Sequence, residues 1–195
     1  MKKLITNYID RLKTTLDNLD KNEIERFINE LLKARDNGKN IFIMGNGGSA
    51  STASHFVCDF NKGMSYKQDK KFKFHCLNDN IATMLAYAND ISYDEVFVEQ
   101  LKNFMEAGDL VIGISGSGNS KNVIKAIDFA NQNGGISIGL TGYDGGLLKK
   151  LAKYSVNANI KDMQISEDIH MMLGHMIYYI HMELNEKMEM ELTCD

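Results

Sequence analysis

The stretch NIFIMGNGGSA, residues 40–50, holds the pattern that decides the fold. Residues 40–44 are a short apolar run typical of a buried β-strand, and glycines and small polar residues follow at once. A helix-compatible segment then continues to about Phe60. A strand that leads through a glycine loop into a helix is the first half of a parallel β/α unit.

The same unit recurs further along the chain. The apolar run DLVIGI at residues 109–114 leads into the loop SGSGNS at 115–120, and residues 123–130 have helical spacing. The other strands are predicted at residues 72–77, 136–140 and 154–160, and the other helices at 81–87, 94–105 and 165 to about 187. This alternation predicts an α/β fold, in which helices cover both faces of a parallel sheet and ligands bind beyond the carboxyl ends of the strands.

Two amphipathic helices are predicted ahead of the first strand, between Leu4 and Ala34. The first ends near residue 18, where Asp20 can cap the second, and the second ends at Asn37-Gly38. We therefore expect one domain over residues 1–195, made of a helical extension (1–37) and an α/β core (38–195). The helical pair should pack on this domain or on a second copy of it.

The composition excludes several classes of protein. With 195 residues, 44% hydrophobic and 25% charged, the chain is typical of one globular domain. Its net charge of −4 provides no field that would hold nucleic acid. Its N-terminus has no apolar signal region and no stretch approaches about 18 apolar residues, so we expect a cytoplasmic protein without a membrane partner. Three cysteines without C-x-x-C spacing, which predict buried or terminal thiols rather than a disulfide framework or zinc ribbon, are Cys58, Cys76 and Cys194.

Each of the two glycine-rich loops has more than one interpretation. Residues 45–50 match the dinucleotide pattern G-x-G-x-x-A, but Asp79, the first acid after the strand at 72–77, comes about ten residues too late to bind a ribose. In the second loop, glycines separate three hydroxyls at a strand-to-helix junction, an arrangement that can surround a phosphomonoester. The alternative is a flexible turn capped by Asn119 or Ser120.

The motifs of this chain resemble those of the sugar isomerase (SIS) domains and, within them, of the phosphoheptose isomerases, also called sedoheptulose 7-phosphate isomerases. The resemblance spans nearly the whole chain. It rests on the ordered segments 45–49, His55-Phe56, Ala88-Asn89-Asp90, 108–120, Asp168-Ile169-His170 and His175.

The resemblance implies a doubly wound, flavodoxin-like sheet of five parallel strands, assembled as a homotetramer with active sites at subunit interfaces. It also implies interconversion of sedoheptulose 7-phosphate and D-glycero-D-manno-heptose 7-phosphate through an enediolate, for heptose precursor biosynthesis, usually with zinc. The alternative is a non-catalytic SIS protein, such as a phosphosugar sensor or a relative of the bacterial initiator-associating proteins. Such a protein would keep the serine loop but would need no acid–base set.

The candidate metal ligands come from two predicted helices. His55 and Asp59 are at positions i and i+4, so their side chains lie on one helical face and can share a metal or a proton path, or form a surface pair. The resemblance adds Glu167 and His175, which completes a set for zinc or another divalent metal. The chain departs from the family pattern at two positions, because that pattern has Glu at position 59 and Gln at position 167.

Helical periodicity and the resemblance disagree about the last helix. Asp168 is at i−7 from His175 and shares its face, whereas Glu167 is about 80° round the helix. We follow the resemblance and expect Glu167 to face the site. The remaining histidines, which we expect to be structural, are His75, His170 and His181.

Each candidate residue has an expected role in an aldose–ketose isomerase. Asp59 is the expected base and His175 the complementary acid. Asn46, Asn89 and Asp90 are expected to bind sugar hydroxyls. The expected phosphate ligands are Ser115, Ser117 and Ser120, and the other expected substrate contacts are Gly47, Gly48, Ser49, Asp59, Gly116 and Glu167.

Overall fold

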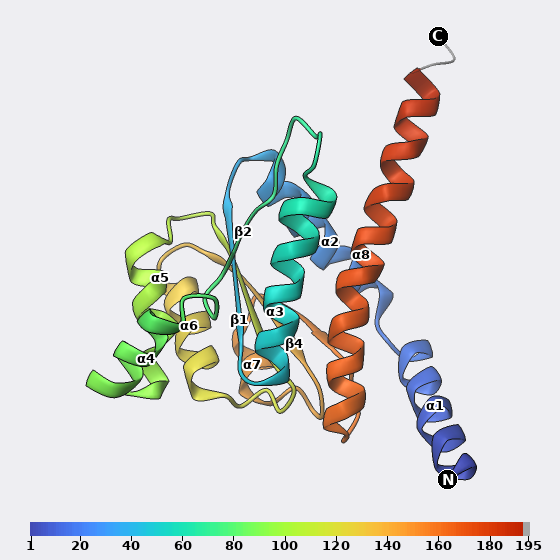
Figure 1. Ribbon diagram of the computed structural model, residues 1–195, viewed down its shortest axis with the longest axis horizontal. Helices are drawn as coiled ribbons and strands as arrows, with labels where there is room; N and C mark the ends of the chain where they lie inside the picture. Colours follow the sequence, from blue (N-terminus) through green and yellow to red (C-terminus); the bar gives the residue numbers. More distant parts are fainter. Residues whose placement is uncertain (193–195) are drawn as a thin grey trace.

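Five parallel strands form the centre of the computed structural model, which describes the backbone of residues 1–192 and the side chains of residues 1–184 (Figure 1). They run in the order β2-β1-β3-β4-β5, which is the flavodoxin-like order, so the predicted fold class is confirmed. The strands are β1 (Asn40–Gly45), β2 (Lys73–Cys76), β3 (Leu110–Ser115), β4 (Ile136–Thr141) and β5 (Tyr154–Asn157). The strand order reverses between β1 and β3, and in open α/β sheets this is where ligands bind.

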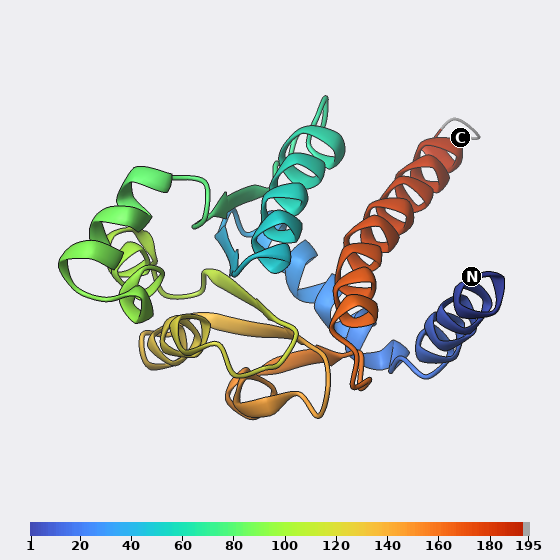
Figure 2. The same cartoon turned by 60° about the horizontal axis from the view of Figure 1, so that its bottom comes forward.

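Helices cover both faces of the sheet (Figure 2). One face is packed by α2 (Lys21–Asp36), α3 (Gly48–Cys58), the π-helical turn η1 (Asp59–Met64) and α8 (Met163–Leu192). The other face is packed by α5 (Val98–Phe104), α6 (Lys121–Gln132) and α7 (Gly146–Leu151).

Alternate strand residues supply the two cores. Ile41 and Ile43 of β1 point to the α2/α3/α8 face, whereas Phe42 and Met44 point to the α5/α6/α7 face. All four are buried. A strand that is buried on both faces needs apolar residues at every position, and this is why the continuous apolar runs of the sequence locate the strands.

Besides the later turns of α8, two further helices extend from the body of the molecule (Figure 1). The first, α1 (Lys2–Asp17), is tied to the start of α8 through Tyr8, which donates to Asp168 Oδ2, and through Arg11, whose guanidinium lies 2.8 Å from an Asp162 oxygen. The second, α4 (Ile81–Asp90), has no buried residue and leads into the 3₁₀ turn η2 (Tyr93–Glu95).

The structure corrects several predicted boundaries. Residues 94–105 do not form one helix, because residues 93–95 form the 3₁₀ turn and α5 begins only at Val98. Strand β5 stops at Asn157 because its side chain accepts a hydrogen bond from the amide of Asn159, which has a φ of +47°. Helix α7 has no counterpart in the sequence prediction, since its six residues span fewer than two turns. Asp20 caps α2 as expected, accepting from Asn22 N at 2.9 Å.

The prediction of buried thiols agrees with the structure only in part. Cys58 is exposed, so the expectation of a buried thiol fails there. Cys76 is half-buried, and burial raises its pKa to about 12. Cys194 lies outside the described residues.

Within residues 1–192, no helix has both the length and the apolar character needed to cross a bilayer.

Candidate active site

The strongest cluster of metal-binding side chains lies between α3 and α8. His55 Nε2 is 2.9 Å from His175 Nε2 and 3.1 Å from Asp59 Oδ2. One ligand atom from each of the three residues lies within 4.8 Å of the others. The three side chains open into a cavity that is also lined by Cys58, Lys62, Gly63 and Tyr178.

Two glycines allow the helices to approach closely at this cluster. A Cβ on Gly174, next to His175, would lie 2.3 Å from the ring of Phe56, and a Cβ on Gly63 would lie 2.3 Å from the ring of Tyr178. The π-helical turn begins at Asp59 and continues directly from the end of α3. The close contact of α3 with α8 therefore places residues 120 positions apart in hydrogen-bond range.

The three side chains fit a divalent metal. Two imidazole nitrogens and one carboxylate oxygen form a donor set that suits zinc and other first-row ions. Two ligands bound to a tetrahedral zinc lie about 3.3 Å apart, so the separations of His55 from His175 and from Asp59 need only a small adjustment. A three-ligand set leaves one coordination position for substrate or water, as in catalytic sites.

Glu167 is not brought to this cluster within one chain. A Cβ on Gly48 would lie 2.7 Å from both Glu167 carboxylate oxygens, so the carboxylate sits against the first residue of α3. Glu167 precedes His175 by eight residues, or about 12 Å along the axis of α8. The N-terminus of α3 carries partial positive charge, which favours a carboxylate at this place.

The neighbouring Asp168 faces a different element. It is exposed and accepts a hydrogen bond from the hydroxyl of Tyr8 in α1, and this bond raises the pKa of Tyr8 to about 12. Of the two neighbouring acids, Glu167 therefore faces α3 and Asp168 faces α1, and neither lies in the His/Asp/His cluster of its own chain.

The serine loop forms a tight connection between β3 and α6. Ser115 Oγ and Ser120 Oγ lie 3.0 Å apart, and Ser117 Oγ accepts from Asn119 N at 3.2 Å. Gly118 has a φ of +68°, and a Cβ there would lie 2.0 Å from the carbonyl oxygen of Gly145, so only glycine fits. The carbonyl of Gly116 accepts from Gly142 N, and the carbonyl of Gly118 accepts from Leu148 N.

The alternative of a turn capped by Asn119 or Ser120 is met by the position of Ser120 but not by its side chain. Ser120 occupies the N-cap position of α6, but its side chain makes no capping hydrogen bond and instead faces Ser115. The Asn119 side chain bonds the carbonyl of Ser117 and the amide of Leu147, which ties the loop to α7. Three hydroxyls and the first amides of a 12-residue helix are thus gathered in a clamped loop, an arrangement suited to an anion such as phosphate.

The loop after β1 presents Asn46, whose side-chain amide exchanges two hydrogen bonds with that of Asn122 on α6. Tyr93 also contacts Asn46, with its hydroxyl 2.9 Å from Oδ1. Our sequence analysis missed both partners, because Asn122 looks like an ordinary polar helix residue and Tyr93 lies between predicted helices. After Asn46, Gly47 has a φ of +55° ahead of α3, where Gly48 is exposed and Ser49 is buried.

The other expected sugar contacts lie at the end of α4. Asn89 and Asp90 are both exposed, and Asn89 Nδ2 donates to Asp90 Oδ1 at 2.8 Å. The segment that follows them is connected to the β1 loop through the hydrogen bond between Tyr93 and Asn46.

The candidate site thus has two parts within one chain. The β1 and serine loops lie at the carboxyl edge of the sheet, at the point where the strand order reverses. His55 lies seven residues after Gly48, so the His/Asp/His cluster is about 10 Å further along α3.

The three other histidines differ in their exposure to solvent. His75 is exposed on β2 and stacks on Phe42, with ring centroids 5.3 Å apart. His170 and His181 are buried. Burial lowers the pKa of both, to about 4 for His170, so its ring is neutral at pH 7 and unsuited to be a general acid.

Comparisons with known proteins assign the chain to a family. The model of the SIS domain matches residues 6–142. A phosphoheptose isomerase from Thermodesulfovibrio yellowstonii is 38% identical over 148 residues, which cover 75% of this chain and 73% of the relative. One from Helicobacter pylori is 33% identical over 178 residues, which cover 91% of each chain. The structure of a phosphoheptose isomerase from Neisseria gonorrhoeae has a TM-score of 0.84 and 27% identity, and the match covers 93% of this chain and 98% of that one. The chain therefore belongs to the phosphoheptose isomerases, a family of SIS-domain proteins.

Proposed function

We propose that this protein interconverts sedoheptulose 7-phosphate and D-glycero-D-manno-heptose 7-phosphate, for heptose precursor biosynthesis in the cytoplasm. The observation that carries the proposal is the convergence of His55, Asp59 and His175. A phosphosugar sensor would need a phosphate loop but no such acid–base group. The names of the relatives support the same activity.

The chemical task is to move a proton between two adjacent carbons. The Asp59 carboxylate removes a proton from C1 of the ketose, the C–H electron pair forms the enediolate double bond, and the C2 carbonyl oxygen takes the negative charge. His175 acts as the acid that supplies a proton to that oxygen. The enediol then loses the proton of its C1 hydroxyl to His175, and the proton held by Asp59 returns at C2 as the carbonyl forms at C1. Zinc or another divalent metal, held by His55, Asp59 and His175, supplies Lewis-acid polarisation of a carbonyl oxygen when bound.

The remaining site residues hold the substrate in the proposal. Ser115, Ser117 and Ser120 bind the phosphate, aided by the backbone at Gly116 and by the α6 N-terminus. The sugar hydroxyls are bound by Asn46, Asn89 and Asp90 and by the start of α3 at Gly47, Gly48 and Ser49. Glu167 contacts the substrate at the carboxyl edge of the sheet. Because about 12 Å separate it from His175 along α8, it contributes to a metal site only from a neighbouring copy.

Turnover of sedoheptulose 7-phosphate, followed by NMR before and after treatment with a chelator, tests the proposal. We expect conversion to the heptose phosphate, loss of the reaction on metal removal and recovery when zinc is added. A protein that binds the sugar phosphate but does not convert it, with or without added metal, would be a non-catalytic SIS protein.

Replacing Ser117 or Ser120 with Ala should weaken phosphosugar binding by roughly 1–3 kcal/mol per lost charge-assisted hydrogen bond. Both side chains lie in the loop rather than in a core, so thermal unfolding should change little. Titration calorimetry with the sugar phosphate measures the loss, and Ser51→Ala, at an exposed position on α3, is the control. Unchanged affinity in both loop variants would place the phosphate elsewhere.

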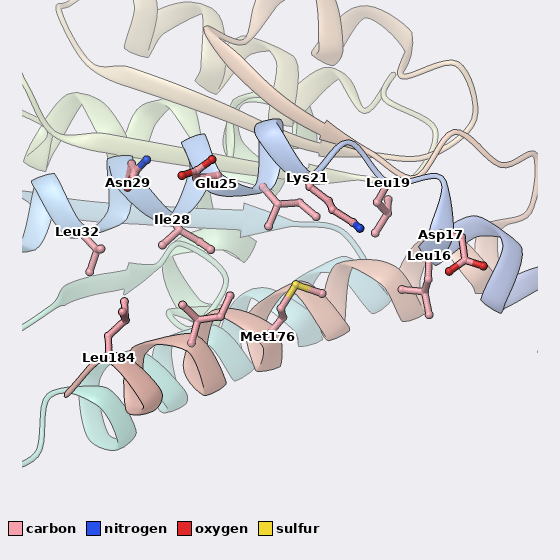
Figure 3. A pocket seen from close by; sticks show the side chains of 12 residues that line it. Leu16, Asp17, Leu19, Lys21, Glu25, Ile28, Asn29, Leu32, Met176 and Leu184 are labelled. Carbon is pink, nitrogen blue, oxygen red and sulfur yellow. The ribbon is translucent and has the colours of Figure 1, made fainter. Parts of the chain in front are cut away.

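We also propose that the active form is a homotetramer with sites at subunit interfaces. Helix α1 leaves Leu4 71% and Ile5 53% exposed, and an open groove of about 580 Å³ lies between α2 and α8. Apolar side chains from both helices, among them Ile28, Met176 and Leu184, line this groove (Figure 3). Copies of the chain that pack together through these surfaces would remove the apolar side chains of α1 and of the groove from water. Light scattering should give the tetramer mass at micromolar concentration, and a monomer would contradict the proposal.

A further inference from the structure

The side chains of Asn46 and Asn122 form a reciprocal pair of hydrogen bonds that joins the β1 loop to α6. Asn46 Nδ2 donates to Asn122 Oδ1, and Asn122 Nδ2 donates to Asn46 Oδ1, both at 2.9 Å. Asn122 is only 2% exposed. A buried amide whose oxygen and nitrogen are both hydrogen-bonded has one stable orientation, because the flipped one places donor against donor and acceptor against acceptor.

A backbone group determines which way round this pair is arranged. The amide of Val123 donates to Asn122 Oδ1 at 2.9 Å, and a backbone N–H can only donate. The Asn122 atom at this place is therefore its oxygen, and the Asn46 atom that faces it must be Nδ2. Asn46 Oδ1 consequently faces Asn122 Nδ2, and Tyr93, 2.9 Å away, donates its hydroxyl proton to the same oxygen.

The consequence for Asn46 is that its amide can only donate to a ligand. Its Oδ1 already accepts from Asn122 and from Tyr93. Its Nδ2 carries two hydrogens, and among the residues whose side chains are described, Asn122 Oδ1 is its one hydrogen-bond partner. One N–H is left at the carboxyl edge of the sheet, beside the predicted sugar contacts.

We propose that Asn122 and Tyr93 are positioning residues that hold Asn46 as a hydrogen-bond donor to the substrate oxygen that becomes negatively charged in the enediolate, at an interface site where Asn46 of one copy faces the His/Asp/His cluster of a neighbouring copy. The inference rests on the proposed function and goes further, because it assigns a polarity to the Asn46 contact. A freely rotating amide would accept from a sugar hydroxyl as readily as it would donate. A donor fixed before the reaction stabilises charge that develops on oxygen without reorganisation during the reaction.

The test compares Asn122→Asp with Tyr93→Phe. Asp at position 122 still accepts from Val123 N and from Asn46 Nδ2, but its second oxygen opposes Asn46 Oδ1 and removes the arrangement that fixes the amide. We expect kcat to fall at least about 10-fold and KM to change less than 3-fold, because the affected contact strengthens in the transition state. Tyr93→Phe removes one of the two donors to Asn46 Oδ1 and should lower kcat about 2- to 5-fold. Asn133→Asp, the same change at the exposed end of α6, is the matched control.

Two binding probes separate positioning from a structural effect. A phosphorylated sugar hydroxamate resembles the enediolate, and its affinity should fall with kcat in Asn122→Asp. Inorganic phosphate should lose less, namely only what the added negative charge near the α6 N-terminus costs. Equal losses for both probes, or kcat and hydroxamate affinity within 2-fold of the unaltered protein, would overturn the inference.

NMR of the unaltered protein gives a readout that does not depend on turnover or on a variant that folds. With the Asn46 side-chain amide assigned through ¹⁵N labelling, the hydroxamate should shift one of its two Nδ2 protons strongly. Absence of that shift from a bound hydroxamate would contradict the inference. Failure of the proposed function would give a different result: the unaltered protein would bind phosphate but would neither convert the sugar nor bind the hydroxamate. In that case Asn46 would have no enediolate to contact.

Discussion

Asp59→Asn is expected to lower isomerase activity at least about 10²-fold while the protein remains folded. Asn keeps the size of the side chain and one ligand oxygen, but it has almost no proton affinity, so the substrate loses its base. Asp59 is only half-buried and lies at the start of the π-helical turn, outside both hydrophobic cores, and thermal unfolding should therefore change little.

The comparison variant is Glu167→Gln, which removes the second carboxylate and, like Asp59→Asn, leaves the size of the side chain almost unchanged. Gln is the residue that the family pattern has at this position, and the Glu167 carboxylate lies against Gly48 rather than in the His/Asp/His cluster. We expect this variant to remain active. If Glu167 is the base, the outcome reverses: Glu167→Gln is nearly inactive and Asp59→Asn survives. Measuring kcat and bound metal for both variants side by side identifies the carboxylate that moves the proton.

His55→Ala and His175→Ala should each lose the bound metal and nearly all isomerase activity. Each substitution removes one of two nitrogens that lie 2.9 Å apart in the cluster, and His175→Ala also removes the proposed acid. Metal content by elemental analysis and turnover of sedoheptulose 7-phosphate are the two measurements. His75→Ala, at an exposed histidine of β2, is the control and should keep both metal and activity. Full activity in both cluster variants, with no metal in the purified protein, would remove the proposed site and favour a phosphosugar sensor.

The positions of the strands and of the serine loop could be predicted because both depend on local chemistry. Strands buried on two faces require continuous apolar runs, and β1, β3 and β4 occur within a residue of the predicted ranges. The loop between β3 and α6 requires small residues, because a side chain on Gly118 would collide with the Gly145 carbonyl. The short helix α7 and the 3₁₀ turn at residues 93–95 lacked such a signal, since neither is long enough to show a helical period.

The last helix shows why periodicity did not identify the side chain that faces α3. Periodicity reports which residues share a face of one helix, and by this criterion Asp168 is the partner of His175. Helix α8, however, has α1 beside its start and α3 along its length, so two of its faces meet other helices. Asp168 meets Tyr8 of α1, and Glu167 meets Gly48 of α3. The neighbours of a helix, rather than its own period, decide which acid reaches which element.

The sequence by itself determined the α/β class, the two glycine loops and the types of residue that could bind a metal or a phosphate, because these properties depend on near neighbours in the chain. Only the tertiary structure decided which of those residues meet. His55 and His175 come into contact because Gly174 lets α8 approach Phe56 of α3, and no local pattern contains that approach. The same holds for Asn46, whose orientation is fixed by Asn122 of α6. Asn122 is oriented in turn by the Val123 amide, and the packing of α6 on the sheet brings it to Asn46 from far along the chain. Burial and close packing select contacts across the whole chain, and a pattern within one segment cannot report them.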